Sequence, residues 1–177
     1  MADIQALPDL WLLSDERNDT ALDDALRRLP EGSGFVFRHY HLDEAAREKR
    51  FRALSAIAHE RRHIVVLSGS AELTRSWGAD GIYGPAAALA GSPELLRIAT
   101  AHNLAEIGEA NRIHADAAML SPVFATRSHP DAETLGPARF RLLAREAAMP
   151  VIALGGMTIE NAAVLDWPRW AAIDGLS

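Results

Sequence analysis

The chain has 177 residues, of which 49% are hydrophobic and 24% charged, with a formal net charge of −6. This balance predicts a single globular domain over residues 1–177 that buries its own core. No apolar run reaches the roughly 18 residues of a membrane span, and the first ten residues lack the pattern of a secretion signal, so we expect a cytoplasmic protein. The absence of cysteine excludes disulfides, thiolate metal sites and a cysteine nucleophile. The acidic balance argues against nucleic acid as a partner and leaves anionic small molecules open.

Short apolar runs recur along the chain with helical patterns between them. They occupy residues 10–15, 35–40, 63–69, 80–84, 96–102, 117–123, 150–156 and 170–175. The runs are continuously apolar rather than alternating, which is typical of parallel strands buried on both faces. We therefore predict eight buried parallel strands from these eight runs.

The intervening segments carry signals for helix starts. Thr20, with Asp23 three residues later, resembles a capping box, and Pro137 stands near the first turn of a helix predicted over 138–148. The other predicted N-cap residues are Asp43, Asn103 and Thr158. The segments after the third and fourth strands leave room for about two helical turns each.

Eight strands with interposed helices fit either a doubly wound sheet or a closed (β/α)8 TIM barrel, and the count favours the barrel. Such barrels use about 250 residues, so this α/β barrel is expected to be compact. Only Leu176 and Ser177 follow the last run, so we expect a barrel without an eighth helix. The wall between the first and seventh helices would then be covered by a partner chain, by an N-terminal segment or by a missing C-terminal segment, and the first of these gives a physical reason for a homodimer.

The segment PVIALGG, residues 150–156, is a strand that ends on Gly155 and Gly156 ahead of a predicted helix. Glycines let the backbone approach a ligand closely, and the N–H groups at a helix start attract anions. The alternative is an ordinary turn between strand and helix. In a barrel, phosphate is often held after strands seven and eight, so Gly175 and Ser177 are expected to complete a phosphate site. The alternative for Ser177 is a disordered tail.

The loop SPVFATRSHP, residues 121–130, follows the sixth strand and is rich in hydroxyl and cationic donors. Ser121, Thr126, Ser128 and His129, together with Arg127, suit the oxygens of a phosphate or diphosphate. The alternative is a solvated turn shaped by its two prolines. Because the loop neighbours the Gly-Gly turn in a barrel, we favour the functional interpretation.

Other strand ends add candidates. Arg38 follows the second strand and can clamp an anion, while His39 or His41 could transfer protons near neutral pH. Side chains alternate between the two faces of a strand, so only some of these residues can face the pocket. Thr100, on the fifth strand, is the expected inward group there, ahead of His102.

The residues themselves predict no metal site. Mg²⁺ prefers carboxylates beside phosphate oxygens. The third strand ends in Ser68 and Gly69 and the fourth in Gly84 and Pro85, so no acidic pair faces the phosphate region. The histidines show no metal-ligand spacing.

Four motifs together resemble the thiamine phosphate synthase and TenI superfamily: GADG (78–81), AHN (101–103), LSPVFATRSHP (120–130) and PVIALGGMT (150–158). The resemblance implies a barrel that binds a thiazole phosphate and joins it to a pyrimidine methyl diphosphate, releasing diphosphate. It also implies Mg²⁺ and basic residues that hold the leaving group.

The same resemblance implies roles for individual residues. Gly156 and the end of the eighth strand near Ser177 would hold the thiazole phosphate. Thr126 and Ser128 would contact the substrates, and Thr100 and Arg38 would lie on the diphosphate side. We further expect that Gly156→Val weakens phosphate binding and leaves the fold intact.

Departures from the family pattern gather where the chemistry is expected. Tyr40 replaces a lysine on the second strand, and Ser68 and Gly69 replace the asparagine and aspartate of the third, which removes a Mg²⁺ ligand. His129 replaces a lysine. The place of the histidine used by TenI-type isomerases corresponds to Ser121.

Three functions follow. The first is a synthase or a TenI-like isomerase acting on thiazole phosphate. The second is a non-catalytic module that binds phosphate or a thiamine precursor on the same fold. The third is an unrelated phosphate-handling barrel enzyme, although no lysine at a strand end could form the Schiff base of an aldolase.

Overall fold

The computed structural model describes residues 6–128 and 130–177 and contains the eight predicted strands. They are β1 (Leu10–Leu13), β2 (Gly34–Phe37), β3 (Ile64–Leu67), β4 (Gly81–Pro85), β5 (Leu96–Ala101), β6 (Ala117–Leu120), β7 (Val151–Ala153) and β8 (Trp170–Ala172). Most of the strands end earlier than the predicted apolar runs, because the last residues of those runs belong to the loops at the carboxyl ends of the strands.

Helices follow the first seven strands. They are the 3-10 helix η1 (Glu16–Ala21), α1 (Leu22–Arg28), α2 (Glu44–Glu60), α3 (Ala71–Trp77), α4 (Ala86–Leu89), α5 (Leu104–Arg112), α6 (Gly136–Ala144) and α7 (Ile159–Leu165). As predicted, α3 and α4 are short. None of the helices in the described ranges has the length and apolarity that a bilayer span requires.

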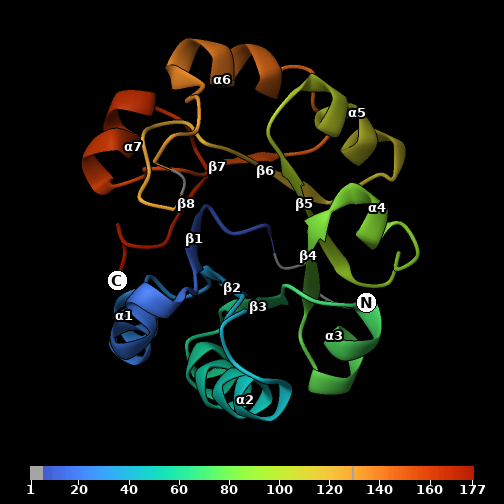
Figure 1. The fold of residues 1–177 in the computed structure, drawn as a ribbon, viewed down its shortest axis with the longest axis vertical. Helices are drawn as coiled ribbons and strands as arrows, with labels where there is room; N and C mark the ends of the chain where they lie inside the picture. The colour runs from blue at the N-terminus through green and yellow to red at the C-terminus, as the bar shows by residue number, and fades with distance from the viewer. Residues whose placement is uncertain (1–5, 129) are drawn as a thin grey trace.

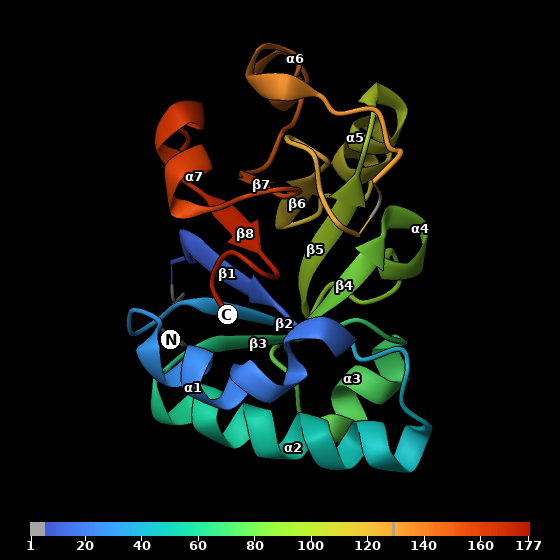
Figure 2. The same cartoon turned by 60° about the vertical axis from the view of Figure 1, so that its left-hand side comes forward.

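The strands form a closed parallel barrel in chain order, with β1 paired to both β2 and β8. The helices stand around this barrel (Figure 1), and the turned view shows α1 and α2 packed side by side along β1 to β3 (Figure 2). The structure therefore confirms the TIM-barrel prediction. Parallel closure brings all eight carboxyl ends to one face of the barrel, where the loops of the site meet.

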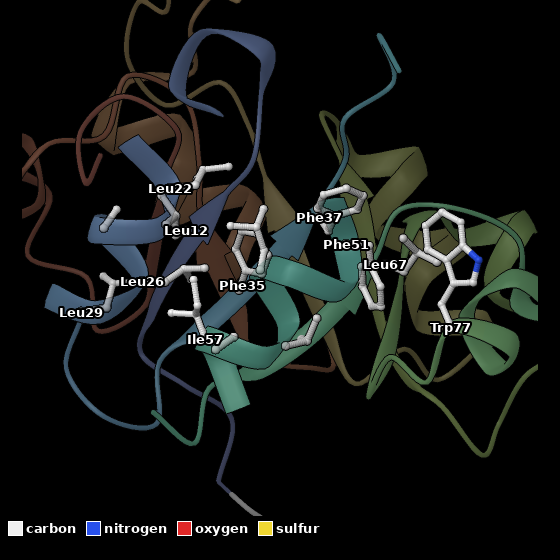
Figure 3. Packing of buried hydrophobic residues seen from close by; sticks show 14 residues of the cluster. Leu12, Leu22, Leu26, Leu29, Phe35, Phe37, Phe51, Ile57, Leu67 and Trp77 are labelled. Carbon is white, nitrogen blue, oxygen red and sulfur yellow. The ribbon is translucent and has the colours of Figure 1, made fainter. Parts of the chain in front are cut away.

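Residues alternate between the barrel interior and the layer beneath the helices, as strand geometry requires. The interior is filled by Trp11, Leu13, Val36, Ile64, Val66, Tyr83, Ile98, Ala117, Met119, Ile152 and Ala171. Figure 3 shows the outer layer, in which Leu12, Phe35 and Phe37 meet side chains of α1, α2 and α3. Complete burial of one such side chain stabilises the fold by about 1.5–3 kcal/mol.

The capping predictions hold for three helices and fail for one. Asp43, Asn103 and Thr158 accept hydrogen bonds from backbone N–H groups at the starts of α2, α5 and α7. The Thr20 prediction is wrong. The capping box lies at Asp15, whose carboxylate accepts from the Arg17 N–H (3.2 Å), while the Asn18 side chain accepts from the Asp15 N–H (2.8 Å). The chain thus turns into η1 immediately after β1.

The seam between α7 and α1 carries no helix in the described part of the chain, as the sequence predicts. Leu176 partly fills it. This side chain packs against both the cluster beneath α1 and α2 and the cluster beneath α6 and α7. In Figure 1 the C-terminus accordingly lies beside α1.

His39 faces the outer layer rather than the barrel mouth. It is almost fully buried and stacks on Phe37 with ring centroids 4.7 Å apart. Its Nδ1 lies 2.8 Å from Ser14 Oγ and its Nε2 lies 2.8 Å from an Asp19 carboxylate oxygen that also accepts from Arg50. Burial lowers the pKa of His39, against the raising effect of Asp19. The residue therefore serves as a neutral structural group.

We predict that His39→Asn makes folding less sensitive to acid. The lowered pKa means that the unfolded chain takes up a proton near pH 6.5 while folded His39 does not, so stability present above pH 6.5 is lost as the pH falls below it. Asparagine tolerates the positive φ of 41° at this position. Urea unfolding at pH 7.5 and 5.5 measures the difference. Buried His63 also has a lowered pKa and contributes the same pH dependence to both proteins, so the difference between the two slopes reports on His39. An identical pH slope in both proteins would contradict this role.

Candidate functional site

Two adjoining cavities open at the carboxyl ends of the strands. Their volumes are about 290 Å³ and 240 Å³, and they share Thr126, Leu154, Gly155 and Ile173 as a common wall. The first lies over β7 and β8 and the second over β2, β4, β5 and β6. The barrel mouth therefore offers two compartments side by side, each of a size suited to part of a small ligand.

The first cavity, which we call the glycine cavity, is lined by backbone and by cations. Its residues include Gly155, Gly156, Thr158, Asn161, Gly175, Arg17 and Arg127. Within the described ranges, the amide N–H groups of Gly156 and Met157 donate to no acceptor of the protein. Backbone N–H groups and guanidinium groups together favour an anion.

Packing makes glycine necessary in this turn. Gly155 and Gly156 have φ values of 99° and 61°. A Cβ atom on Gly155 would lie 2.6 Å from Pro122 Cα, and one on Gly156 would lie 2.3 Å from the Ala125 carbonyl oxygen. The loop after β6 thus lies directly on the glycine turn, leaving no space for a side chain.

Hydrogen bonds fix the turn from both sides. The Val123 N–H donates to Leu154 O (2.9 Å) and the Phe124 N–H to Gly155 O (3.0 Å). From α7, the Asn161 side-chain amide donates to Gly156 O (2.6 Å). These bonds occupy the carbonyl groups of Leu154, Gly155 and Gly156, which leaves the N–H groups of Gly156 and Met157 among the unpaired polar groups of the turn within the described ranges.

The second cavity, which we call the arginine cavity, is lined by Arg38, Tyr83, His102, Ser121, Thr126 and Ser128 among others. Arg38 is held at its edge: Nε donates to Ser14 O (2.9 Å) and Nη2 to Asp15 Oδ2 (2.8 Å). Burial raises the pKa of Tyr83 to about 12, so its hydroxyl stays neutral. This compartment combines one fixed cation with neutral hydroxyl groups.

His102 also lines the arginine cavity. Its Nδ1 lies 2.8 Å from Glu106 Oε2, and the same carboxylate accepts from the His102 N–H (2.7 Å). Thr100 points inward two residues earlier on β5 and is not among the lining residues described. The structure therefore places His102 in the cavity, where the sequence favoured Thr100.

The structure brings most of the predicted site residues together. Arg38, Ser121, Thr126 and Ser128 line the arginine cavity, while Gly155, Gly156 and Gly175 line the glycine cavity, together with Thr126. Thr100 and Ser177 are not among the lining residues of either cavity, although the exposed Ser177 hydroxyl donates to the carbonyl of Ile173, which lines both (3.0 Å). His129 lies outside the described residues.

Arg17 is a site residue that the sequence reasoning missed. It lines the glycine cavity, and its Nη2 donates to Ser128 Oγ (2.9 Å) in the loop after β6. The available signal was its place directly after β1, because every loop at a carboxyl end of the barrel reaches the same face.

The residues at the ends of β2 to β4 do not fit Mg²⁺. Among residues 6–128 and 130–177, no three His, Asp or Glu side chains gather as a metal would require. Where the family resemblance implies metal ligands, the Ser68 carbonyl accepts from Arg47 Nη2 (2.5 Å) and the Ser68 hydroxyl lies 2.5 Å from Tyr40 OH. Arg47 also donates to Arg38 O (2.9 Å), so a guanidinium stands at this edge in place of carboxylates.

We predict that Gly156→Ala destabilises the protein, which corrects the expectation that Gly156→Val leaves the fold intact. The positive φ alone costs about 1–3 kcal/mol, and the contact with Ala125 O adds to it. Gly84→Ala is the matched control, because nothing lies within 4 Å of its Cβ. Equal melting temperatures for the Gly156→Ala protein and the wild type would contradict the close approach.

The fold and the cavities together define a (β/α)8 barrel protein with two adjoining cavities at the carboxyl ends of its strands. The chain belongs to the thiamine monophosphate synthase family, whose model matches residues 10–166. It is thus a member of a thiamine-biosynthesis family whose small-molecule substrates are phosphorylated thiamine precursors.

Individual relatives agree with this assignment. A relative from Aquifex aeolicus (strain VF5), provisionally named thiamine-phosphate synthase 2, is 26% identical over 88% of this chain and 88% of its own. The thiamine-phosphate synthase of Synechococcus sp. (strain WH7803) is 28% identical over 84% of this chain and 46% of its own. The thiamine phosphate pyrophosphorylase structure from Pyrococcus furiosus has the same fold, with a TM-score of 0.79 and 22% identity over 97% of this chain and 88% of that one.

Proposed function

We propose that the protein is a transferase that joins a thiazole phosphate to a pyrimidine methyl diphosphate, forming thiamine phosphate and releasing diphosphate. The observation that carries this proposal is the pair of adjoining cavities with a common wall at Thr126, Leu154, Gly155 and Ile173. A reaction between two small molecules needs both reacting atoms held near one boundary.

In this proposal the thiazole phosphate occupies the glycine cavity. The N–H groups of Gly156 and Met157, with nearby Arg17 and Arg127, match the charge and the acceptor oxygens of a phosphate monoester. The pyrimidine occupies the more enclosed arginine cavity, with its diphosphate toward Arg38. Ser121, Thr126 and Ser128 supply hydroxyl donors between the two ligands.

The chemistry assigned to this arrangement is a displacement at the methylene carbon of the pyrimidine. The carbon–oxygen bond breaks and its electron pair leaves with the diphosphate, while the lone pair of the thiazole nitrogen forms the new carbon–nitrogen bond. Arg38 stabilises the charge that develops on the leaving oxygen. The wall shared by the cavities aligns nitrogen and carbon.

We propose that this reaction takes place without Mg²⁺ bound by protein side chains, because the ends of β2 to β4 present Arg47, Tyr40 and Ser68 instead of carboxylates. A bound metal supplies several kcal/mol of charge stabilisation to such a reaction. We therefore expect slow turnover.

The binding-module alternative is less favoured. A module that holds only a phosphate needs the glycine cavity and gives no reason for a second cavity with its own fixed cation. Ser121 stands where the resemblance places the histidine of a TenI-type isomerase, which argues against isomerisation through that position.

We predict slow release of diphosphate when both substrates are supplied, with rates in EDTA and in excess Mg²⁺ within about threefold of each other. The physical reason is that Arg38, not a coordinated metal, faces the leaving group. A coupled diphosphate assay measures the release, and a reaction without thiazole phosphate is the control. No release over hours would contradict the transferase, and full dependence on Mg²⁺ would contradict the metal-independent site.

We predict that Arg38→Gln raises KM for the pyrimidine diphosphate about 10–100-fold, since hydrogen bonds to a charged partner contribute about 1.5–3 kcal/mol. KM for the thiazole phosphate should change much less. Arg112→Gln, an exposed arginine on α5 next to Glu109, is the control. An unchanged KM for the diphosphate in Arg38→Gln would remove this residue from the site.

Two properties belong to the same proposal. We propose a cytoplasmic location, because phosphorylated precursors carry charges that keep them inside a membrane-bounded compartment. We also propose a homodimer that covers the seam and the neighbouring face of α7 and α6, where the exposed apolar side chains Ile159 and Val164 lie on α7 and Leu142 lies on α6.

A further inference from the structure

We propose that Arg17 is a specificity-determining ligand for the substrate phosphate in the glycine cavity. We further propose that Asp15 is a positioning residue that holds Arg17 and Arg38, one guanidinium for each cavity. The inference rests on the proposed function and adds to it the residues that set the spacing of its two anion subsites.

Arg17 reaches the cavity from η1 and contacts three different loops. Its Nη2 donates to Ser128 Oγ (2.9 Å) and lies 3.6 Å from Asp174 Oδ2, while its Nε lies 3.2 Å from Asp15 Oδ1. The side chain is 34% exposed, so it stands at the rim rather than in the core. Its position therefore joins the loops after β1, β6 and β8 over the glycine cavity.

The guanidinium has room for an additional acceptor. It carries five N–H donors in a planar fork, and its Nη2 serves one hydroxyl while the contact to Asp174 is longer than a hydrogen bond. A phosphate in the glycine cavity offers shorter, charge-assisted hydrogen bonds. Replacing the loose Asp174 contact by phosphate is compatible with keeping the bond to Ser128.

Asp15 connects the two arginines. One carboxylate oxygen lies 2.8 Å from Arg38 Nη2 and the other lies 3.2 Å from Arg17 Nε. Arg38 lines the arginine cavity and Arg17 lines the glycine cavity. The half-buried carboxylate of Asp15 thus sets the distance between the guanidinium of Arg17 in the glycine cavity and that of Arg38 in the arginine cavity.

The backbone makes Asp15 rigid. It is the N-cap of η1, its carboxylate accepts from the Arg17 N–H, and its own N–H donates to the Asn18 side chain (2.8 Å). Arg17 is therefore anchored to Asp15 through both its backbone and its side chain. Because fewer rotamers are open to a residue held in this way, less entropy is lost when it binds a ligand.

Arg127 is the other arginine that lines the glycine cavity, and both arginines are exposed at its rim. Arg17 is held between loops by Ser128, Asp15 and Asp174, whereas Arg127 forms no hydrogen bond or ion pair within the described ranges. Comparison of the two arginines therefore separates a fixed ligand from general positive charge.

The first experiment measures inorganic phosphate binding to the whole chain by calorimetry. We expect Arg17→Gln to weaken binding at least about tenfold, Arg17→Lys to restore part of it, and Arg127→Gln to weaken it less than Arg17→Gln. Arg27→Gln, an exposed arginine on α1 paired with Asp24, should bind as the wild type does.

The results distinguish a failure of the Arg17 role from a failure of the proposed function. If the wild type binds phosphate and the Arg17→Gln protein binds it with equal affinity, the role of Arg17 is overturned and the proposed function still stands. No phosphate binding by the wild type up to millimolar concentration would overturn the glycine cavity itself, and the inference with it.

The second experiment tests Asp15 by steady-state kinetics. Asp15→Asn keeps an oxygen that caps η1 and removes the charge between the arginines, so we expect KM for both substrates to rise several-fold with a smaller change in kcat. Asp9→Asn is the matched control, because Asp9 forms a similar pair with Arg169 (3.4 Å) before β1 starts, at the other end of the strand. A rise in only one KM, or an equal effect of Asp9→Asn, would overturn the positioning role.

Discussion

The close approach of the loop after β6 to the glycine turn after β7 is the contact on which the site depends. Gly155 and Gly156 leave no space for a side chain beneath Pro122 and Ala125, and two backbone hydrogen bonds from Val123 and Phe124 hold the surfaces together. Thr126, in the loop, and Gly155, in the turn, both lie on the wall shared by the two cavities. Packing thus requires glycine at both positions of the turn.

The second feature of the barrel mouth is a set of arginine side chains held in fixed positions. Arg38, Arg17 and Arg47 are each held by carboxylates or backbone carbonyls at the strand ends. A guanidinium placed in this way is already oriented, so little reorganisation accompanies ligand binding. The family resemblance implies Mg²⁺ for the diphosphate, whereas this chain concentrates arginines there. The difference lies in the loops, because the barrel beneath them is the family fold.

Much of the architecture was predictable because its signals are local. Continuous apolar runs marked all eight strands, and Asp43, Asn103 and Thr158 marked helix starts through their own short-range hydrogen bonds. The error at Thr20 has an equally local cause, since Asp15 and Asn18 form a better box five residues earlier. In the site, the SPVFATRSHP loop and the glycine turn were found by composition, and the structure places them against each other.

Sequence alone determined the positions of the strands along the chain, the glycine turn, the hydroxyl-rich loop and the absence of acids at the ends of the third and fourth strands, because each is a property of neighbouring residues. Tertiary structure decided which side chains meet. It turned His39 into the outer layer, brought His102 rather than Thr100 to the arginine cavity, and set Asp15 between Arg17 and Arg38. These outcomes depend on closure of the barrel, which brings distant loops together at separations that no local pattern encodes.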